Sequence, residues 1–163
     1  PRGPPGFCGV GIIRLNSRLR EVNGYRSGVA MINRGVDALC AEATELVETW
    51  TVEEARAHLD DDDVVFVDIR DIREVWRDGL IPGSVHAPRG MLEFWVDPKS
   101  PYARDVFQSG RRFMFYCAAG LRSVLATRAV QEMGLAPVCH MDGGYGAWKA
   151  AGHPTEVREK SGS

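Results

Sequence analysis

Four short apolar runs, separated by segments of helical character, constrain the fold of this chain most strongly. They occupy residues 64–67, 85–87, 113–116 and 138–141, and the first reads Val-Val-Phe-Val without a polar residue. A strand that is apolar at successive positions is typical of a parallel sheet covered on both faces. Because parallel strands need crossover connections, strands that alternate with helices predict an α/β fold with right-handed crossovers.

The segments between the runs have the features of helices. We expect helices over residues 72–77, 91–96, 123–133 and 145–151, the last two closed by Gly134 and Gly152. Thr51 and Glu54 form a capping box that predicts the start of another helix, which runs through residue 59. The four aspartates at 60–63 then predict a solvated turn, with a metal site as the alternative.

Apolar residues before the capping box recur at spacings of three and four from Val36 to Trp50. This pattern predicts one N-terminal helix, residues 35–50, ahead of the main domain at 51–156, with a disordered tail at 157–163. Residues 1–34 differ in charge, with a net of +5 against −7 for the remainder. We expect them to form a flexible basic arm; the alternative is that the native chain begins at Met31.

Composition and charge exclude several classes of protein. The net charge of −2 gives no basic field for nucleic-acid binding. The four cysteines form no Cys-x-x-Cys pair, so neither a zinc ribbon nor a thioredoxin motif is present, and no metal or other cofactor is expected. Sparse thiols suit a cytoplasmic location, although two disulfides stay open. No apolar run approaches the roughly 20 residues that span a bilayer, so no membrane segment is predicted.

The residues that follow the strands should carry the chemistry, because ligands bind at the carboxyl ends of parallel strands. The longest such segment is Cys117-Ala118-Ala119-Gly120-Leu121-Arg122, just before a predicted helix. Its small residues let the backbone curl so that successive N–H groups point inward and form an anion nest. That environment favours the thiolate form of Cys117. The alternative is a buried structural cysteine.

Other motifs predict structure rather than chemistry. The glycines at 143, 144 and 146 match neither a dinucleotide-binding fingerprint nor a P-loop, and they predict a tight strand-to-helix turn. Cys139 and His140 are neighbours on a strand, so their side chains face opposite ways and cannot share a metal ion. His86 is expected to be packed or hydrogen-bonded, with a catalytic base as the alternative.

Taken together, these motifs closely resemble the rhodanese (sulfurtransferase) domain over about residues 50–156. The resemblance rests on Val-Asp-Ile-Arg at 67–70, Glu74, Gly-Leu-Ile-Pro-Gly-Ser at 79–84, Cys-Ala-Ala-Gly-Leu-Arg-Ser at 117–123, and Asp-Gly-Gly at 142–144 with Trp148 and Gly152. Leu80 replaces a histidine common in the second motif. The resemblance implies a five-stranded parallel sheet flanked by helices on both faces, in a single-domain protein whose Cys117 carries a persulfide.

The activity that the resemblance implies is sulfur transfer. Cys117 would attack the outer sulfur of a small anionic donor such as thiosulfate, and a thiophilic acceptor would then take the sulfur: cyanide, a thiol or a partner protein. The loop N–H groups would stabilise the persulfide, and Arg122 would attract the donor. These N–H groups belong to Ala118, Ala119, Gly120, Leu121, Arg122 and Ser123.

Arg70 and Arg89 also follow strands, and each has two alternative roles. Either arginine contacts substrate, or it forms a structural ion pair with Asp68, Asp71 or Glu74.

Two functions of other classes stay open. A relative of this fold hydrolyses phosphate esters with a Cys-x5-Arg loop, but the loop here is the shorter Cys-x4-Arg from Cys117 to Arg122. The other is a non-enzymatic module that carries sulfur or binds a protein partner, which would keep the same cysteine and loop.

Deleting residues 1–30 should leave folding and sulfur transfer nearly unchanged, because a glycine-rich segment without periodicity has little apolar surface to bury. Thermal melting and turnover of the shortened chain test this. A loss of more than about 2 kcal/mol in the free energy of unfolding would show that the segment docks on the domain.

Overall fold

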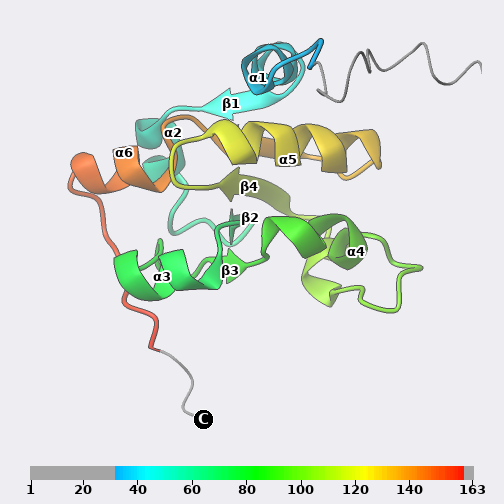
Figure 1. Ribbon diagram of the computed structural model, residues 1–163. Coiled ribbons are helices and arrows are strands. Elements are labelled where there is room, and N and C mark those ends of the chain that lie inside the picture. The colour runs from blue at the N-terminus through cyan, green and yellow to red at the C-terminus, as the bar shows by residue number, and fades with distance from the viewer. Residues whose placement is uncertain (1–31, 160–163) are drawn as a thin grey trace, which may run out of the picture. The chain divides into compact units, whose positions relative to one another are not determined.

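A five-stranded sheet, parallel throughout, forms the centre of the protein in the computed structural model, which describes residues 32–159 (Figure 1). The spatial order of the strands is β1-β5-β4-β2-β3. The strands are β1 (Glu48–Trp50), β2 (Val64–Asp68), β3 (Val85–His86), β4 (Arg112–Tyr116) and β5 (Val138–Met141). All four predicted strands are confirmed, and β1 is the fifth. The predictions on residues 1–31 and 160–163 lie outside the described residues.

Helices cover both faces of the sheet, as expected. They are α1 (Val36–Thr44), α2 (Val52–Ala57), α3 (Ile72–Asp78), α4 (Leu92–Val96), α5 (Leu121–Glu132) and α6 (Gly144–Ala150), with short 3-10 helices at Arg89–Met91 and Asp105–Gln108. Alternate residues of each strand face opposite ways. Val67 and Phe115 pack with residues of α4 and α5, whereas Phe66 and Met114 pack with residues of α2 and α6.

The N-terminal helix is shorter than predicted. It ends at Thr44, the chain turns at residues 45–47, and residues 48–50 form the edge strand β1 beside β5. The helical spacing predicted that Val47 lies on the same helix as Cys40 and Ala43. Val47 does pack with these two residues against Val124 of α5, but it lies beyond the turn that ends the helix. Trp50 instead joins the core on the other face.

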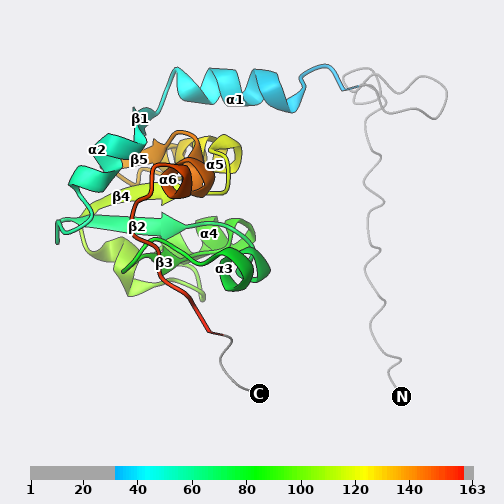
Figure 2. The same cartoon turned by 90° about the vertical axis from the view of Figure 1, so that its left-hand side faces the viewer.

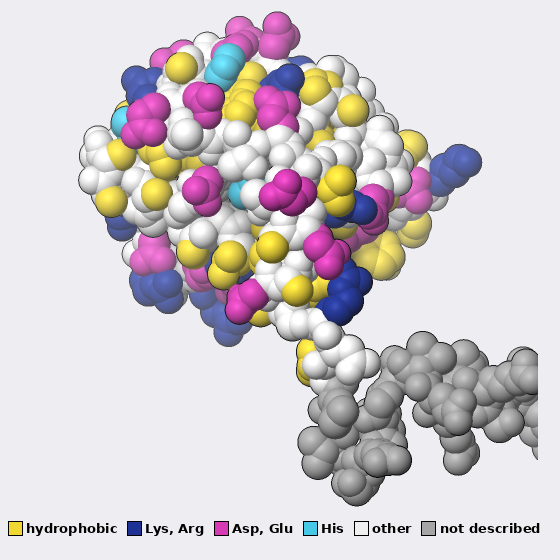
Figure 3. Space-filling model, turned by 90° about the horizontal axis from the view of Figure 1, so that it is seen from above, with side chains coloured by type: hydrophobic (Ala, Val, Ile, Leu, Met, Phe, Trp, Pro, Cys, Tyr) yellow, Lys and Arg dark blue, Asp and Glu magenta, His cyan; other side chains and the backbone are white. Residues whose placement is uncertain are grey.

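Residues 36–50, expected as a helix ahead of the main domain at 51–156, pack together with that domain in the structure. β1 belongs to the sheet, and the part of the chain that begins at Val36 forms one compact unit. Figure 2 shows α1 at the side of α5. Figure 3 views the molecule from the side of α1 and shows hydrophobic side chains exposed among acidic ones. Within residues 36–50, the large hydrophobic residues that are exposed are Val36, Leu39 and Leu46.

The predicted caps and turns are confirmed. The Thr51 hydroxyl accepts a hydrogen bond from the Glu54 N–H at 3.1 Å, and the Glu54 carboxylate accepts one from the Thr51 N–H at 2.7 Å. α2 ends at Ala57, two residues earlier than expected, and the aspartates then form a turn in which the Asp61 carboxylate accepts the Asp63 N–H. Within residues 32–159, no helix is both long and apolar enough to cross a bilayer.

A buried ion pair closes the carboxyl end of β2. The Arg70 guanidinium donates to Asp68 Oδ1 at 2.9 Å and to Oδ2 at 2.5 Å, and it also donates to the Gly79 carbonyl at 2.7 Å. Both side chains are 1% exposed or less. The Tyr145 ring lies 4.1 Å from the guanidinium carbon, so one arginine joins β2, the end of α3 and α6. Of the two roles predicted for Arg70, the structure shows the ion pair with Asp68.

Replacing Arg70 by Met should lower the free energy of unfolding by about 3–5 kcal/mol, because the Asp68 carboxylate would stay buried without a counter-charge. Urea denaturation measures this loss. Arg73→Met is the matched control, since Arg73 pairs with Asp71 at the surface, where its side chain is 81% exposed. Equal losses in the two variants would contradict a structural role for the buried pair.

Candidate active site

Cys117 lies at the carboxyl end of β4, in the four-residue loop that leads into α5. It continues the row of Phe113 and Phe115, and its side chain is 1% exposed in the core under α4 and α5. α5 begins at Leu121, two residues earlier than predicted, because Gly120 takes a left-handed conformation with φ of 91° and caps the helix. Burial alone would suit a structural cysteine as well, so the loop geometry has to distinguish the two interpretations.

The backbone N–H groups of this loop are free of protein acceptors. Within residues 32–159, none of the N–H groups from Ala118 to Ser123 donates a hydrogen bond, whereas the carbonyls of Cys117, Ala118 and Gly120 each accept one. The Cys117 carbonyl accepts the Tyr145 N–H at 2.7 Å, and the Ala118 carbonyl accepts the Gly146 N–H at 2.9 Å. The free donors thus precede and begin the 12-residue helix α5, whose dipole also favours a negative charge there.

The glycines after β5 allow this arrangement. Gly143 and Gly144 both have positive φ, and they form the predicted turn between β5 and α6. A Cβ atom on Gly144 would clash with the Cys117 carbonyl oxygen, and it would lie only 2.9 Å from the Ala119 nitrogen. The turn therefore touches the back of the Cys117 loop, and only glycine permits the approach.

A buried polar chain holds the other end of the loop. The Ser123 hydroxyl donates to the Gly120 carbonyl at 2.9 Å and lies 3.5 Å from His140 Nδ1. His140 Nε2 lies 3.0 Å from the Thr49 hydroxyl of β1, and burial lowers the pKa of the imidazole. Cys139 faces the opposite core, as predicted. His86 is hydrogen-bonded, through Nε2 to the Arg70 carbonyl at 2.8 Å.

Arg122 has a partner that the sequence did not predict. Its two terminal nitrogens donate to the two oxygens of Glu74 at 2.7 and 2.8 Å. The pairing with Glu74, together with the nearby Cys117 sulfur, raises the pKa of Arg122. Glu74 also accepts the Asp71 N–H at 3.1 Å, which completes a capping box on α3. The spacing of Asp71 and Glu74 is the sequence signal that could have predicted this capping box, but it does not predict the pairing with Arg122.

Arg89 is likewise paired, but with a residue of its own segment. It donates to both oxygens of Glu93 at 2.6 and 2.8 Å. Of its two alternative roles, the structure therefore shows an ion pair, but with a partner that the sequence analysis did not name. Asp71, a further candidate partner, binds Arg73 instead.

The remaining thiols differ from Cys117 in their surroundings. Cys40, Cys117 and Cys139 are all free, whereas Cys8 lies outside the described residues. Burial raises the pKa of Cys139 to about 12, so its nucleophilic thiolate is almost absent near neutral pH. The Cys40 sulfur lies 3.7 Å from the Leu121 carbonyl and acts as a packing group between α1 and α5.

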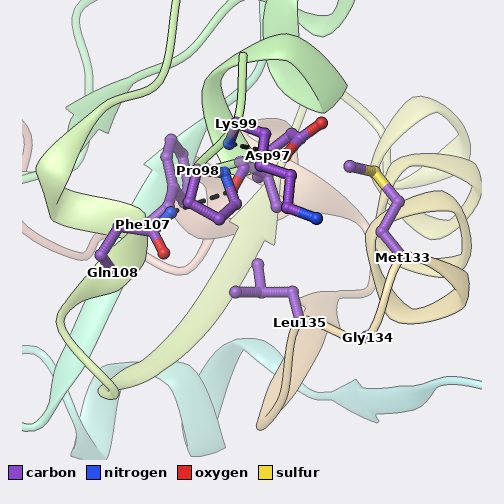
Figure 4. Close-up of a pocket in the computed structure, with 9 residues that line it drawn as sticks. Asp97, Pro98, Lys99, Phe107, Gln108, Met133, Gly134 and Leu135 are labelled. Carbon is purple, nitrogen blue, oxygen red and sulfur yellow. Dashed lines mark hydrogen bonds between the residues drawn. The ribbon is translucent and has the colours of Figure 1, made fainter.

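Two cavities lie at opposite ends of the sheet. One, of about 280 Å³, borders the Cys117 loop at Ala118 and is lined by Arg70, Asp78, Ala118, Tyr145, Gly146 and Lys149. A larger one, of about 470 Å³, lies between the ends of α4 and α5, with Phe107, Met133 and Leu135 around it (Figure 4). In the described part of the chain, no three His, Cys, Asp or Glu side chains gather where they could hold a metal ion.

Comparison with known proteins gives a consistent family. The model of the rhodanese-like domain matches residues 51–151. A mouse protein, thiosulfate sulfurtransferase/rhodanese-like domain-containing protein 3, is 29% identical over 135 residues, which cover 80% of this chain and 83% of that protein. Thiosulfate sulfurtransferase GlpE of Pseudoalteromonas translucida is 32% identical over 93 residues, covering 57% of this chain and 80% of its own.

A solved structure from Rhodopseudomonas palustris has a higher sequence identity to this chain. That protein, of unknown function and described as a possible tyrosine phosphatase, is 54% identical to this chain with a TM-score of 0.77. The match covers 78% of this chain and 98% of that one.

Replacing Gly144 by Ala should displace the Cys117 loop and destabilise the domain by at least about 1–2 kcal/mol, the cost of a left-handed backbone for a residue with a Cβ atom. Unfolding in urea and the rate of Cys117 alkylation measure the two effects. Gly90→Ala is the control, because its Cβ would meet no atom within 4 Å. If both variants behaved like the parent protein, the contact between the turn and the loop would not organise the site.

Proposed function

This chain belongs to the family of rhodanese-like domains, and on that premise we propose that it is a sulfurtransferase that carries sulfur as a persulfide on Cys117. The observation that supports this most strongly is the set of N–H groups from Ala118 to Ser123, which have no acceptor within residues 32–159 and directly follow the cysteine in the loop. Such donors stabilise a negative charge without reorganisation. A persulfide on Cys117 has that charge on its outer sulfur.

The reaction follows two displacement steps. In the first, the Cys117 thiolate attacks the outer sulfur of thiosulfate; the sulfur–sulfur bond of the donor breaks, and sulfite leaves with the bonding electrons. In the second, an acceptor nucleophile attacks the outer sulfur of the persulfide, and the electrons of the broken bond return to the Cys117 thiolate. No general base is needed while the thiol is ionised, and the loop donors stabilise both charged forms.

The ion pair with Glu74 changes the role that Arg122 can have in binding the donor. The donor is a small anion, and Arg122 would attract it as one half of the Arg122–Glu74 pair rather than as an isolated charge. Arg89 and Arg70 are paired in the same way. We therefore assign most of the anion stabilisation to the backbone donors, and we expect the protein to act in a reducing compartment such as the cytoplasm, where its thiols stay free.

A phosphatase is the second candidate, because the similar Rhodopseudomonas palustris protein is described as a possible tyrosine phosphatase. The loop argues against it. Only four residues separate Cys117 from Arg122, one fewer than in the phosphatases of related fold, and Glu74 occupies both terminal nitrogens of the arginine. Sulfur carriage to a single protein partner, without turnover of small acceptors, is a third function that the same site could perform.

Incubation with thiosulfate should add one sulfur atom, about 32 Da, to the intact protein at Cys117. Intact-mass spectrometry and peptide mapping detect the product. Cys117→Ser should not load, whereas Cys139→Ser should load normally, because burial holds Cys139 in its protonated form. Loading that survives the Cys117→Ser substitution would contradict the assignment of Cys117 as the residue that carries the sulfur.

The same preparation distinguishes the two rival functions. Hydrolysis of an aryl phosphate that depends on Cys117 would establish the phosphatase. Loading without transfer to cyanide or to any small thiol would instead identify a carrier that serves a protein partner.

A further inference from the structure

Each N–H group of the Cys117 loop takes its direction from the carbonyl of the same peptide group. In a planar trans peptide, the N–H points opposite to the carbonyl of the preceding residue. Helix α6 donates to the Cys117 carbonyl at 2.7 Å and to the Ala118 carbonyl at 2.9 Å. Because these two carbonyls are held, α6 sets the direction of the Ala118 and Ala119 N–H groups.

The Leu121 N–H is oriented by a different group. Its peptide partner is the Gly120 carbonyl, which accepts the Val124 N–H at 3.0 Å and the Ser123 hydroxyl at 2.9 Å. The first of these hydrogen bonds belongs to α5 itself, whereas the second comes from a side chain that is fully buried. The Ser123 hydroxyl is therefore the side-chain group that fixes the peptide between Gly120 and Leu121.

His140, a buried residue of β5, supports Ser123 from the sheet. Its Nδ1 lies 3.5 Å from the Ser123 oxygen, and its Nε2 lies 3.0 Å from the Thr49 hydroxyl of β1. The single hydroxyl proton of Ser123 goes to the Gly120 carbonyl, so the Ser123 oxygen faces His140 as an acceptor. We therefore assign the imidazole proton to Nδ1, which leaves Nε2 to accept from Thr49. Burial lowers the pKa of His140, which favours this neutral imidazole.

The Cys117 sulfur lies at the beginning of α5. Glu74 and, less strongly, this sulfur raise the pKa of Arg122, so the sulfur is close to the first turn of the helix. Leu121 is the first residue of α5, and its N–H has no acceptor within residues 32–159. The free donor and the reactive sulfur thus lie at the same end of the helix, where the helix dipole also favours negative charge.

We propose that His140 is a positioning residue of this site, which holds the Gly120 peptide group through the Ser123 hydroxyl so that the Leu121 N–H stabilises negative charge on Cys117. The inference rests on the proposed function in one respect, namely that the loop N–H groups stabilise the Cys117 thiolate and persulfide. His140 exchanges no proton with substrate in this role. Without the Ser123 hydroxyl, the Gly120 carbonyl keeps only the helical bond to Val124, and the peptide group is freer to tilt.

The pH dependence of Cys117 alkylation tests the proposal, because the thiolate reacts and the thiol does not. Iodoacetamide, a neutral reagent, is used, and the reaction is followed on the Cys117 peptide by mass spectrometry. Ser123→Ala should move the midpoint of the rate to higher pH by about half a unit to one unit, the effect of one lost hydrogen bond. Thr127→Val is the matched control and should keep the parent midpoint. It also removes a buried hydroxyl from α5, but that hydroxyl lies 3.5 Å from the Cys139 carbonyl rather than in the loop.

Two variants of His140 separate positioning from packing. His140→Leu and His140→Asn introduce side chains of nearly equal size, but only asparagine keeps an N–H donor near the place of Nδ1. We expect His140→Leu to move the midpoint to higher pH, by less than Ser123→Ala because a contact of 3.5 Å is long for a hydrogen bond. His140→Asn should restore the parent midpoint. Equal midpoints in the leucine and asparagine variants would overturn the role of His140, and a parent-like midpoint in Ser123→Ala would overturn the whole proposal.

Backbone amide signals in NMR give a second readout, which is independent of activity. In His140→Leu, the Leu121 amide signal should move more than the signals of Ala118 and Ala119, whose directions α6 sets. Equal changes at the three amides would contradict a path through Ser123. Treatment of the parent protein with thiosulfate separates the two hypotheses. An absence of sulfur loading would overturn the proposed function alone, whereas the alkylation midpoints and the amide signals decide the role of His140.

Discussion

The contact between the Gly143–Gly144 turn and the Cys117 loop is the constraint on which the rest of the site depends. Two stretches of backbone approach closely enough that a single Cβ atom on Gly144 would clash with the loop. At this distance, N–H groups of α6 donate hydrogen bonds to the carbonyls of Cys117 and Ala118. Because each peptide group points its N–H opposite to its carbonyl, the loop donors are left for a ligand. The anion-binding property that we propose for the loop thus depends on a contact on its other side.

The charged side chains around the Cys117 loop form ion pairs that hold the fold together, whereas we assign substrate binding to backbone groups. The buried Asp68–Arg70 pair and the Glu74–Arg122 pair hold β2, α3 and α5 in position, and each arginine is occupied by a carboxylate. In the mechanism that we propose, neutral backbone dipoles, which need no counter-ion, stabilise the reactive sulfur. A paired arginine has its guanidinium fixed by two hydrogen bonds, so it serves better as a scaffold than as a mobile anchor.

Local patterns predicted most of the architecture, and they failed where a tertiary contact overrode them. The runs at β2, β4 and β5 are continuous and apolar, and the Thr51–Glu54 capping box depends only on residues three apart, so both were predictable. β1 was missed because three residues are too few for an alternating pattern. Leu46, Val47 and Trp50 even continued the helical period of α1, although residues 45–47 form a turn and residues 48–50 pair with β5.

The sequence by itself determined the components of the candidate site: a cysteine after a buried strand, small residues that let the loop curl, and glycines that let a second turn approach it. These properties follow from residue types at short spacing. Only the tertiary structure decided which carboxylate each arginine binds and that Glu74 reaches Arg122 across 48 positions. Ion pairs between distant segments depend on how the elements pack, and side-chain charge alone does not specify which partners meet.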